Sequence, residues 1–237
     1  MGTRFWSVVF DANDHVALAR FWSDALGWSF GDSGEDTSYV RGEDERVPRL
    51  EFVPSSEPKL AKNRLHLDLS TTSDDHHDIT VERLLGLGAR HVDIGQHDIT
   101  WTVLADPEGN ELCVLRPDKD YGQAAPIGTI CLDADDVPTM ANFWTAATGW
   151  PITRLDHVAV LHAGVGPTFV MGPKVAPKPG KNRLHIDVAP PADGDQGAEV
   201  ERLIALGARR VDIGQGDVPW VVLTDPEGNE FCVLTPR

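Results

Sequence analysis

The sequence predicts an α+β protein in which one β-α-β-β-β unit occurs four times. The second half of the chain repeats the first, and each half contains two cycles in which a strand pattern precedes a helical pattern. A repeat of about 120 residues is too long for a solenoid, so tandem duplication of a whole domain explains it. We therefore expect similar domains at residues 1–117 and 126–237, joined by a linker at 118–125.

The repetition is strongest in the second part of each half. Residues 62–115 match residues 181–234 at a shift of 119, and roughly 33 of the 54 aligned pairs are identical. Near the start of each half the shift is 122, which aligns Phe21-Trp22 with Phe143-Trp144. The second copy is therefore three residues shorter between these regions.

Hydrophobic periodicity places the elements within the first copy. Residues 5–11 form a short apolar run that predicts a strand, and Asp14 is suited to cap a helix that ends at Gly27. A second helix is expected to end at Gly88. Polar and apolar side chains alternate over residues 64–69, which is typical of a strand with one face toward water or a ligand. The other strands are expected at residues 39–40, 49–53, 92–94, 101–104 and 111–115.

Composition and charge exclude several functional classes. The chain of 237 residues carries 21 Lys and Arg against 37 Asp and Glu, and its net charge of −16 repels nucleic acid and anionic lipid surfaces. No apolar run approaches the ~18 residues of a membrane span, and the start lacks a secretory signal. Its 3 cysteines are too few for a disulfide framework. The sequence predicts a cytoplasmic protein with reduced thiols and neither nucleic-acid nor membrane partners.

Two motifs occur in the same order in both copies. Phe21-Trp22 is followed by Leu26-Gly27-Trp28, and the segment from Asp106 to Asn110, Asp-Pro-Glu-Gly-Asn, opens the last strand. This pattern resembles the vicinal oxygen chelate superfamily, and most of all its glyoxalase-like domains, beside glyoxalases, extradiol dioxygenases and bleomycin-resistance proteins. The resemblance implies tandem domains, each with two units that form an open half-barrel around a cleft. This fold hosts lyases, isomerases, dioxygenases, transferases and binding proteins, so it does not specify a reaction.

The resemblance also implies where a divalent metal binds in the metal-dependent members. Their ligands, usually His and Glu, come from the first and last strands of each unit. The corresponding positions here are Ser7, Glu51, His66 and Cys113 in the first copy and Thr129, Val170, His185 and Cys232 in the second. Ser7 and Thr129 are poor ligands at neutral pH, and Val170 cannot bind a metal. Because a catalytic zinc normally needs three protein ligands, we predict no metal cofactor. The less favoured alternative is a divalent ion held by His66, Glu51 and Cys113.

Strand alternation predicts which other side chains face the clefts. His66 shares a face with Asp68, and Glu111 shares one with Cys113. A carboxylate beside a histidine raises the imidazole pKa and fixes its tautomer, which suits proton transfer near neutral pH. The predicted general bases are His66 and His185, oriented by Asp68 and Asp187 or by Glu111 and Glu230. The competing interpretation is that each histidine only ties two strands together.

Several further residues are candidates for substrate binding. They are Ser7, Asp11, Trp101 and Cys113 in the first copy, and Thr129, Asp133, Trp220 and Cys232 in the second. The two thiols could be nucleophiles, although small thiols on strands more often pack in the core. The two tryptophans could stack on a planar ligand or close the core, and the core is favoured. The basic segments at residues 62–64 and 181–183 could meet an anionic ligand, but a solvated loop is favoured.

Two functional classes remain. One is a protein that binds a small organic molecule without a complete metal site. The other is an enzyme of the superfamily: a metal-dependent lyase, isomerase or dioxygenase, or a metal-free acid/base catalyst that uses His66 and His185. In both cases we expect a small-molecule ligand, and either a monomer whose copies form an internal pseudo-dimer or a homodimer.

Overall fold

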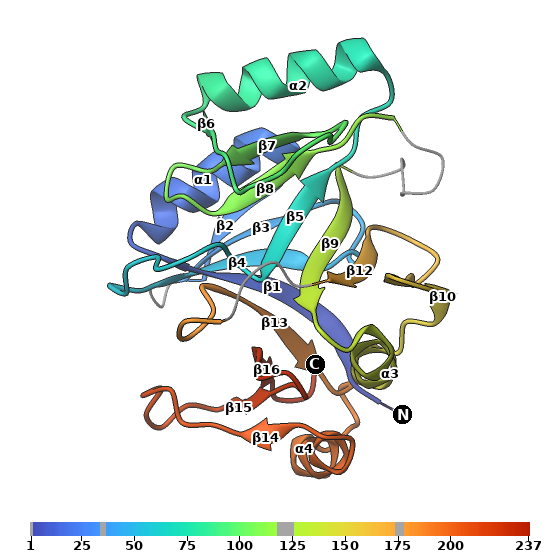
Figure 1. Ribbon diagram of the computed structural model, residues 1–237. Helices are drawn as coiled ribbons and strands as arrows, with labels where there is room; N and C mark the ends of the chain where they lie inside the picture. Colours follow the sequence, from blue (N-terminus) through green and yellow to red (C-terminus); the bar gives the residue numbers. More distant parts are fainter. Residues whose placement is uncertain (1, 34–36, 118–125, 174–177) are drawn as a thin grey trace.

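The computed structural model describes residues 2–33, 37–117, 126–173 and 178–237, and within them it contains four helices and two eight-stranded sheets (Figure 1). The linker expected at 118–125 lies outside the described residues. The elements follow the predicted order, with four β-α-β-β-β units along the chain. No helix in the described ranges is long and apolar enough to cross a membrane.

The first copy contains units 1 and 2. Unit 1 consists of β1 (Arg4–Ala12), α1 (His15–Leu26), β2 (Ser29–Asp32), β3 (Ser38–Arg41) and β4 (Arg49–Pro54). Unit 2 consists of β5 (Leu65–Leu69), α2 (Asp74–Gly86), β6 (Arg90–His91), β7 (Thr102–Ala105) and β8 (Glu111–Val114).

The second copy contains units 3 and 4. Unit 3 consists of β9 (Ile127–Ala134), α3 (Val137–Thr148), β10 (Ile152–Leu155), β11 (Ala159–Leu161) and β12 (Thr168–Pro173). Unit 4 consists of β13 (Leu184–Ala189), α4 (Gln196–Ala205), β14 (Arg209–Arg210), β15 (Val221–Thr224) and β16 (Glu230–Val233).

Each sheet joins one unit from each copy. Sheet A has the strand order β14-β15-β16-β13-β1-β4-β3-β2, and sheet B has the order β10-β11-β12-β9-β5-β8-β7-β6. The copies meet through the antiparallel pairs β1–β13 and β5–β9. This corrects the expected pairing of units within one copy, because unit 1 completes its sheet with unit 4 and unit 2 with unit 3. The first strand of each unit thereby finds a partner for an edge that would otherwise be unpaired.

The two units of one copy pack through their helix and turn instead of through a shared sheet. The carboxylate of Asp106 accepts hydrogen bonds from the indole of Trp22 at 3.2 Å and from the backbone and side chain of Asn110, both at 2.9 Å. Glu108, in the same turn, accepts from the backbone N–H groups of Asn13 and Asp14 at 2.8 Å. The Asp-Pro-Glu-Gly-Asn motif therefore fixes unit 2 against the start of α1.

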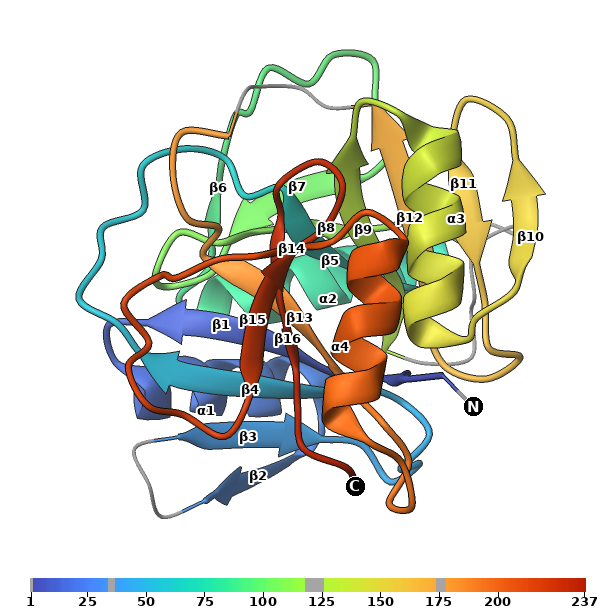
Figure 2. The ribbon, with the colours of Figure 1, turned by 90° about the horizontal axis from the view of Figure 1, so that it is seen from below.

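The first helix shows how local sequence produces these elements. Asp14 caps α1 by accepting a hydrogen bond from the backbone N–H of Ala17, and Gly27 ends it in the left-handed conformation, with φ of 67°. The buried face of α1 carries Trp22, which packs at 5.4 Å from the ring of Phe10. In the second copy, α3 and α4 lie side by side (Figure 2).

Two local expectations need correction. The strand expected at 92–94 is the two-residue β6, which lies slightly earlier, at Arg90–His91. The strand β2 at Ser29–Asp32 was not predicted. This strand is at the edge of sheet A and is only partly buried, so it lacks the apolar alternation that identifies a strand.

The pairing between copies gives a direct prediction. Residues 1–117 and 126–237, produced as separate chains, should bind each other in a 1:1 complex. Alone, the first half leaves β1 and β5 without the strands that pair with them at the centre of each sheet, and the second half leaves β9 and β13 without theirs. Size-exclusion chromatography with light scattering measures the stoichiometry. The uncut chain is the control, and two halves that each stay folded and monomeric when mixed would contradict the prediction.

Candidate functional site

The cleft face of each sheet combines residues from both copies. On sheet B, Asp68 of β5 lies between Thr129 of β9 and Cys113 of β8. On sheet A, Asp187 of β13 lies between Ser7 of β1 and Cys232 of β16. These six residues therefore gather at two centres, and each centre takes residues from both copies.

One consequence is a correction to the alternative metal set. Glu51 was grouped with His66 and Cys113 because all three belong to the first copy. In the structure Glu51 is on β4 of sheet A, where it lies beside Val9 and is bound by Arg49 at 2.7 Å. His66 and Cys113 are on sheet B, so these three residues do not form one site.

The centre of sheet B is a group of His66, Asp68 and two thiols, of which Asp68 and Cys113 are buried and His66 and Cys131 are partly buried. The Nε2 atom of His66 lies 3.4 Å from Oδ1 of Asp68, and Oδ2 of the same carboxylate accepts from Sγ of Cys131 at 3.1 Å. Nδ1 of His66 and Oδ1 of Asp68 are buried without a hydrogen-bond partner among the described residues. Buried polar atoms normally have a partner, so these two are available to a ligand or an ion.

Burial controls the protonation of this centre. It lowers the pKa of His66 to about 3, with the positive charge of Lys62 adding to the effect. It raises the pKa of Asp68 to about 6 against the opposing hydrogen bonds from the cysteines. We expected the carboxylate to raise the imidazole pKa, and this was wrong because the loss of hydration outweighs the attraction. His66 is uncharged at neutral pH and is a weak base.

Sheet A repeats this centre with small differences. Nε2 of His185 lies 3.6 Å from Oδ1 of Asp187, and the hydroxyl of Ser7 lies 3.3 Å from Oδ2 as a hydrogen-bond donor. Burial lowers the pKa of His185 to about 3. Burial and the nearby charge of Glu51 raise the pKa of Asp187 well above its usual value, which favours the protonated carboxyl group.

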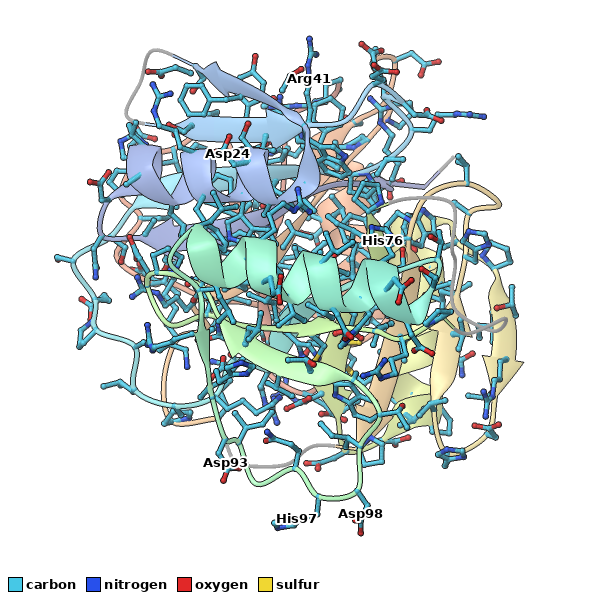
Figure 3. All side chains as sticks on the ribbon, turned by 90° about the horizontal axis from the view of Figure 1, so that it is seen from above. Asp24, Arg41, His76, Asp93, His97 and Asp98 are labelled. Atoms are coloured by element: carbon cyan, nitrogen blue, oxygen red, sulfur yellow. The ribbon has the colours of Figure 1, made fainter. Side chains whose placement is uncertain are left out.

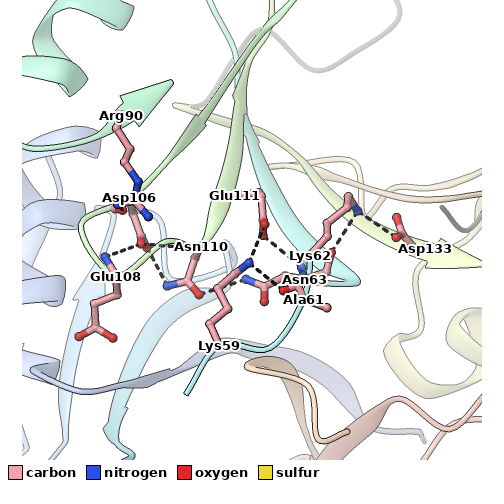
Figure 4. Close-up of polar contacts among 10 residues, drawn as sticks. All are labelled: Lys59, Ala61, Lys62, Asn63, Arg90, Asp106, Glu108, Asn110, Glu111 and Asp133. Carbon is pink, nitrogen blue, oxygen red and sulfur yellow. Dashed lines mark hydrogen bonds and ion pairs between the residues drawn. The ribbon is translucent and has the colours of Figure 1, made fainter. Parts of the chain in front are cut away.

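The other predicted acidic residues bind lysines. Glu111 accepts from Nζ of Lys59 at 2.6 Å and from the backbone N–H of Asn63 at 3.1 Å (Figure 4). Glu230 makes the same contacts with Lys178 and Asn182, at 2.6 and 3.0 Å. The nearest carboxylates to Nε2 of the two histidines are therefore Asp68 and Asp187, while Glu111 and Glu230 anchor the loops before β5 and β13.

Ion pairs between the copies hold Asp11 and Asp133. Nζ of Lys62 binds Asp133 at 2.9 Å, and Lys181 binds Asp11. The favoured interpretation of residues 62–64 as a solvated loop was wrong, because Asn63 and Arg64 are both buried and Arg64 donates to the side chain of Asn229 at 3.0 Å. These basic residues connect the copies.

The two clefts differ in the wall that comes from units 1 and 3. On sheet A the ring of Trp6, with Val211 and Ile213, packs on a small apolar cluster. That cluster consists of Ala189, Val222, Cys232 and Leu234. The residue that aligns with Trp6 in the second copy is Gly128, and those that align with Arg49 and Glu51 are Thr168 and Val170. Sheet B thus has small, uncharged residues where sheet A has an indole and an ion pair.

A pocket of about 200 Å³ opens on sheet B beside this smaller wall. It is lined by Asp68, Thr100, Trp101, Leu115, Arg116, Thr129, Cys131 and Val170. Trp101 is 40% exposed and Trp220 is 38% exposed, so the favoured placement of these rings in the core was wrong. Leu115 and Arg116, which directly follow β8, were not among the predicted site residues. Their position at the end of a cleft strand was the signal that could have identified them.

The donor atoms at each centre can be tested against the metal that the fold implies. His66, Asp68 and Cys113 each offer one ligand atom, and these atoms lie within 4.8 Å of one another; His185, Asp187 and Cys232 do the same. Asp68 and Asp187 are outside the ligand positions implied by the resemblance, so the expected donors were His66, Cys113 and Glu51 in the first copy and only His185 and Cys232 in the second. Three donors of N, O and S type fit a divalent ion such as Zn²⁺ in number and kind.

The four units, their sheets and their clefts define the vicinal oxygen chelate class of proteins. The family model of the glyoxalase-like domain matches residues 7–115 and again 129–234, so the chain belongs to the glyoxalase-like domain family. A comparison with curated proteins finds no match.

Solved structures share this fold at low sequence identity. Glyoxalase I from Zea mays has a TM-score of 0.67 and 12% identity, and the match covers 99% of this chain and 92% of that one. A putative dioxygenase from Bacillus subtilis subsp. subtilis str. 168 has a TM-score of 0.62 and 12% identity, covering 99% of this chain and 85% of that one. At this identity the similarity establishes the fold.

The environment of the thiols predicts low reactivity. Burial and the neighbouring carboxylates raise the pKa of Cys113, Cys131 and Cys232, so few thiolates exist at pH 8. The native protein should react with Ellman's reagent at least about 100-fold more slowly than the protein unfolded in guanidinium. A fast reaction of one thiol in the native state would disagree with this expectation and restore the interpretation of that cysteine as a nucleophile.

Proposed function

We propose that this protein binds a small organic molecule in the cleft of sheet B. The pocket of about 200 Å³ beside Asp68 and Trp101 is the observation that carries this proposal. Pockets for drug-sized ligands have volumes of roughly 300–1,000 Å³, so this one suits a compound with a single ring. The corresponding face of sheet A is covered by Trp6, and we assign binding to sheet B alone.

The side chains of the pocket specify the chemistry of its ligand. The exposed ring of Trp101 can stack on a planar group, and Leu115 and Val170 supply apolar surface. Oδ1 of Asp68 is buried without a partner and can accept a hydrogen bond from a hydroxyl or amide group of the ligand. A mostly apolar ring that carries one hydrogen-bond donor fits this arrangement.

The two exposed tryptophans provide a matched test. Trp101→Ala should weaken binding of phenol, catechol or benzamide by about tenfold or more, because the stacking surface is lost. Trp220→Ala, at the equivalent position on the other sheet, should leave the affinity unchanged. Thermal shift and Trp fluorescence titrations measure the affinity of each variant. A chelator should leave these affinities unchanged.

Two results would contradict binding in the pocket of sheet B. If none of the three compounds binds and no other small molecule copurifies in native mass spectrometry, the pocket is not a binding site. An equal loss in the two variants would show that binding does not depend on sheet B.

A second candidate function is a metal-dependent enzyme of this superfamily. The convergence of His66, Asp68 and Cys113 within 4.8 Å is the observation that favours it. A divalent ion held there would act as a Lewis acid toward an oxygen atom of the substrate. The metal-free acid/base alternative is less favoured, because burial lowers the pKa of His66 to about 3.

Metal content separates the two candidates. For the enzyme, the purified protein should contain close to one equivalent of a transition metal per occupied centre by mass spectrometry. Added Co²⁺ should give thiolate-to-metal charge-transfer absorption, which Cys113→Ala removes from sheet B and Cys232→Ala removes from sheet A. Apo protein that gives no Co²⁺ absorption, while still binding a ring compound, would exclude the enzyme and leave the binding protein.

A further inference from the structure

A second cavity, outside the cleft of sheet B, is rich in arginine. It has a volume of about 370 Å³ and lies between the start of β1 and the loop that joins β3 to β4. Its charged lining residues are Arg4, Arg41, Arg46, Arg49, Asp44 and Glu45. Four positive groups face two negative groups in a chain whose net charge is −16. The cavity is therefore a local positive site on an acidic protein.

Guanidinium groups surround one indole at this site. The Cζ atoms of Arg4, Arg49 and Arg237 lie 4.7, 5.2 and 5.4 Å from the centre of the Trp6 ring. Each distance is within the range of a cation–π contact. Three like charges around one ring also repel one another, and the aromatic quadrupole compensates only part of that repulsion.

Acidic partners neutralise only some of these groups. Arg49 binds Glu51 at 2.7 Å, and Arg46 binds Asp44 at 2.7 Å. Arg4 donates to a main-chain oxygen of Arg237 at 3.2 Å. Arg41 is exposed at the outer edge of the molecule (Figure 3), and it has no acidic partner within the described part of the chain. Within the described residues Arg4 and Arg41 thus form no ion pair with an Asp or Glu side chain, and against the single remaining acidic group, Glu45, they leave the cavity an excess of positive charge.

The second copy does not reproduce this arrangement. At the aligned positions, Pro126 replaces Arg4, Gly128 replaces Trp6 and Thr168 replaces Arg49. The arginine cluster around Trp6 therefore has no counterpart at the aligned positions of the second copy. It is also separate from the proposed ligand pocket, since the two cavities share no lining residue.

We propose that this cavity binds a small oxyanion, a carboxylate or a phosphate group. Arg4 and Arg41 would supply the forked N–H donors that match such groups. Trp6 and Trp150 line the same cavity and would contact an apolar part of the ligand. The site is independent of binding on sheet B.

Titration calorimetry at constant ionic strength and pH 7 tests the proposal with two probes, inorganic phosphate and benzoate. We expect saturable binding of at least one. Arg4→Gln and Arg41→Gln should each weaken it about tenfold, since each removes charged hydrogen bonds. Arg209→Gln, on the opposite edge strand of sheet A, is the control for net charge and should have no effect. Trp101→Ala should also have no effect, which separates this site from the pocket of sheet B.

Each result of these titrations either supports or overturns the proposed anion site. Binding of phosphate alone identifies a phosphate-bearing ligand, and binding of benzoate alone identifies a carboxylate; both support the site. No saturation by either probe up to about 10 mM would overturn it, as would an equal loss in Arg209→Gln. Arg41 is exposed, so its variant keeps the test valid if Arg4→Gln lowers the thermal stability.

Discussion

The antiparallel pairing of β1 with β13 and of β5 with β9 is the constraint on which both clefts depend. It sets Asp187 opposite Ser7 and Asp68 opposite Thr129, so each cleft has one wall from each copy. Units 2 and 4, which share more of their sequence than units 1 and 3 do, supply the His-x-Asp strand and the cysteine strand to different sheets. Units 1 and 3 have diverged, and they supply the opposite walls. Duplication with this pairing therefore yields two similar chemical centres in two different surroundings.

Burial dominates the electrostatics of these centres. A histidine 3.4 Å from a carboxylate in water would become more basic, yet the pKa of His66 falls because both groups have lost their hydration. The same loss raises the pKa of Asp68 and of the adjacent thiols. Near neutral pH the centre holds a neutral imidazole, thiols and a carboxyl group close to its titration range. A neutral imidazole with so low a pKa is a poor general base near neutral pH.

Much of the fold could be predicted from the sequence because its signals are local. The Asp14 cap, the Gly27 stop and the alternation over residues 64–69 each involve neighbouring residues, and all four units were identified. The alternation also indicated which side chains share a face, such as His66 with Asp68. Periodicity does not determine which edge a strand will pair with, so the joining of unit 1 to unit 4 was missed. The errors over Glu51 and over Lys62, whose partner Asp133 is in the other copy, follow from that.

The wall of sheet A links the closed cleft to the arginine cluster. Trp6 covers the apolar cluster of β13, β15 and β16, and the guanidinium of Arg49 packs on its ring. Glu51 balances the charge of Arg49, and its own charge raises the pKa of Asp187 across the cleft. The Trp6 ring thus contacts a cation, the cation pairs with Glu51, and the charge of Glu51 adds to burial in favouring the protonated form of Asp187. On sheet B, Gly128, Thr168 and Val170 replace these three side chains, and the pocket of about 200 Å³ opens beside that smaller wall.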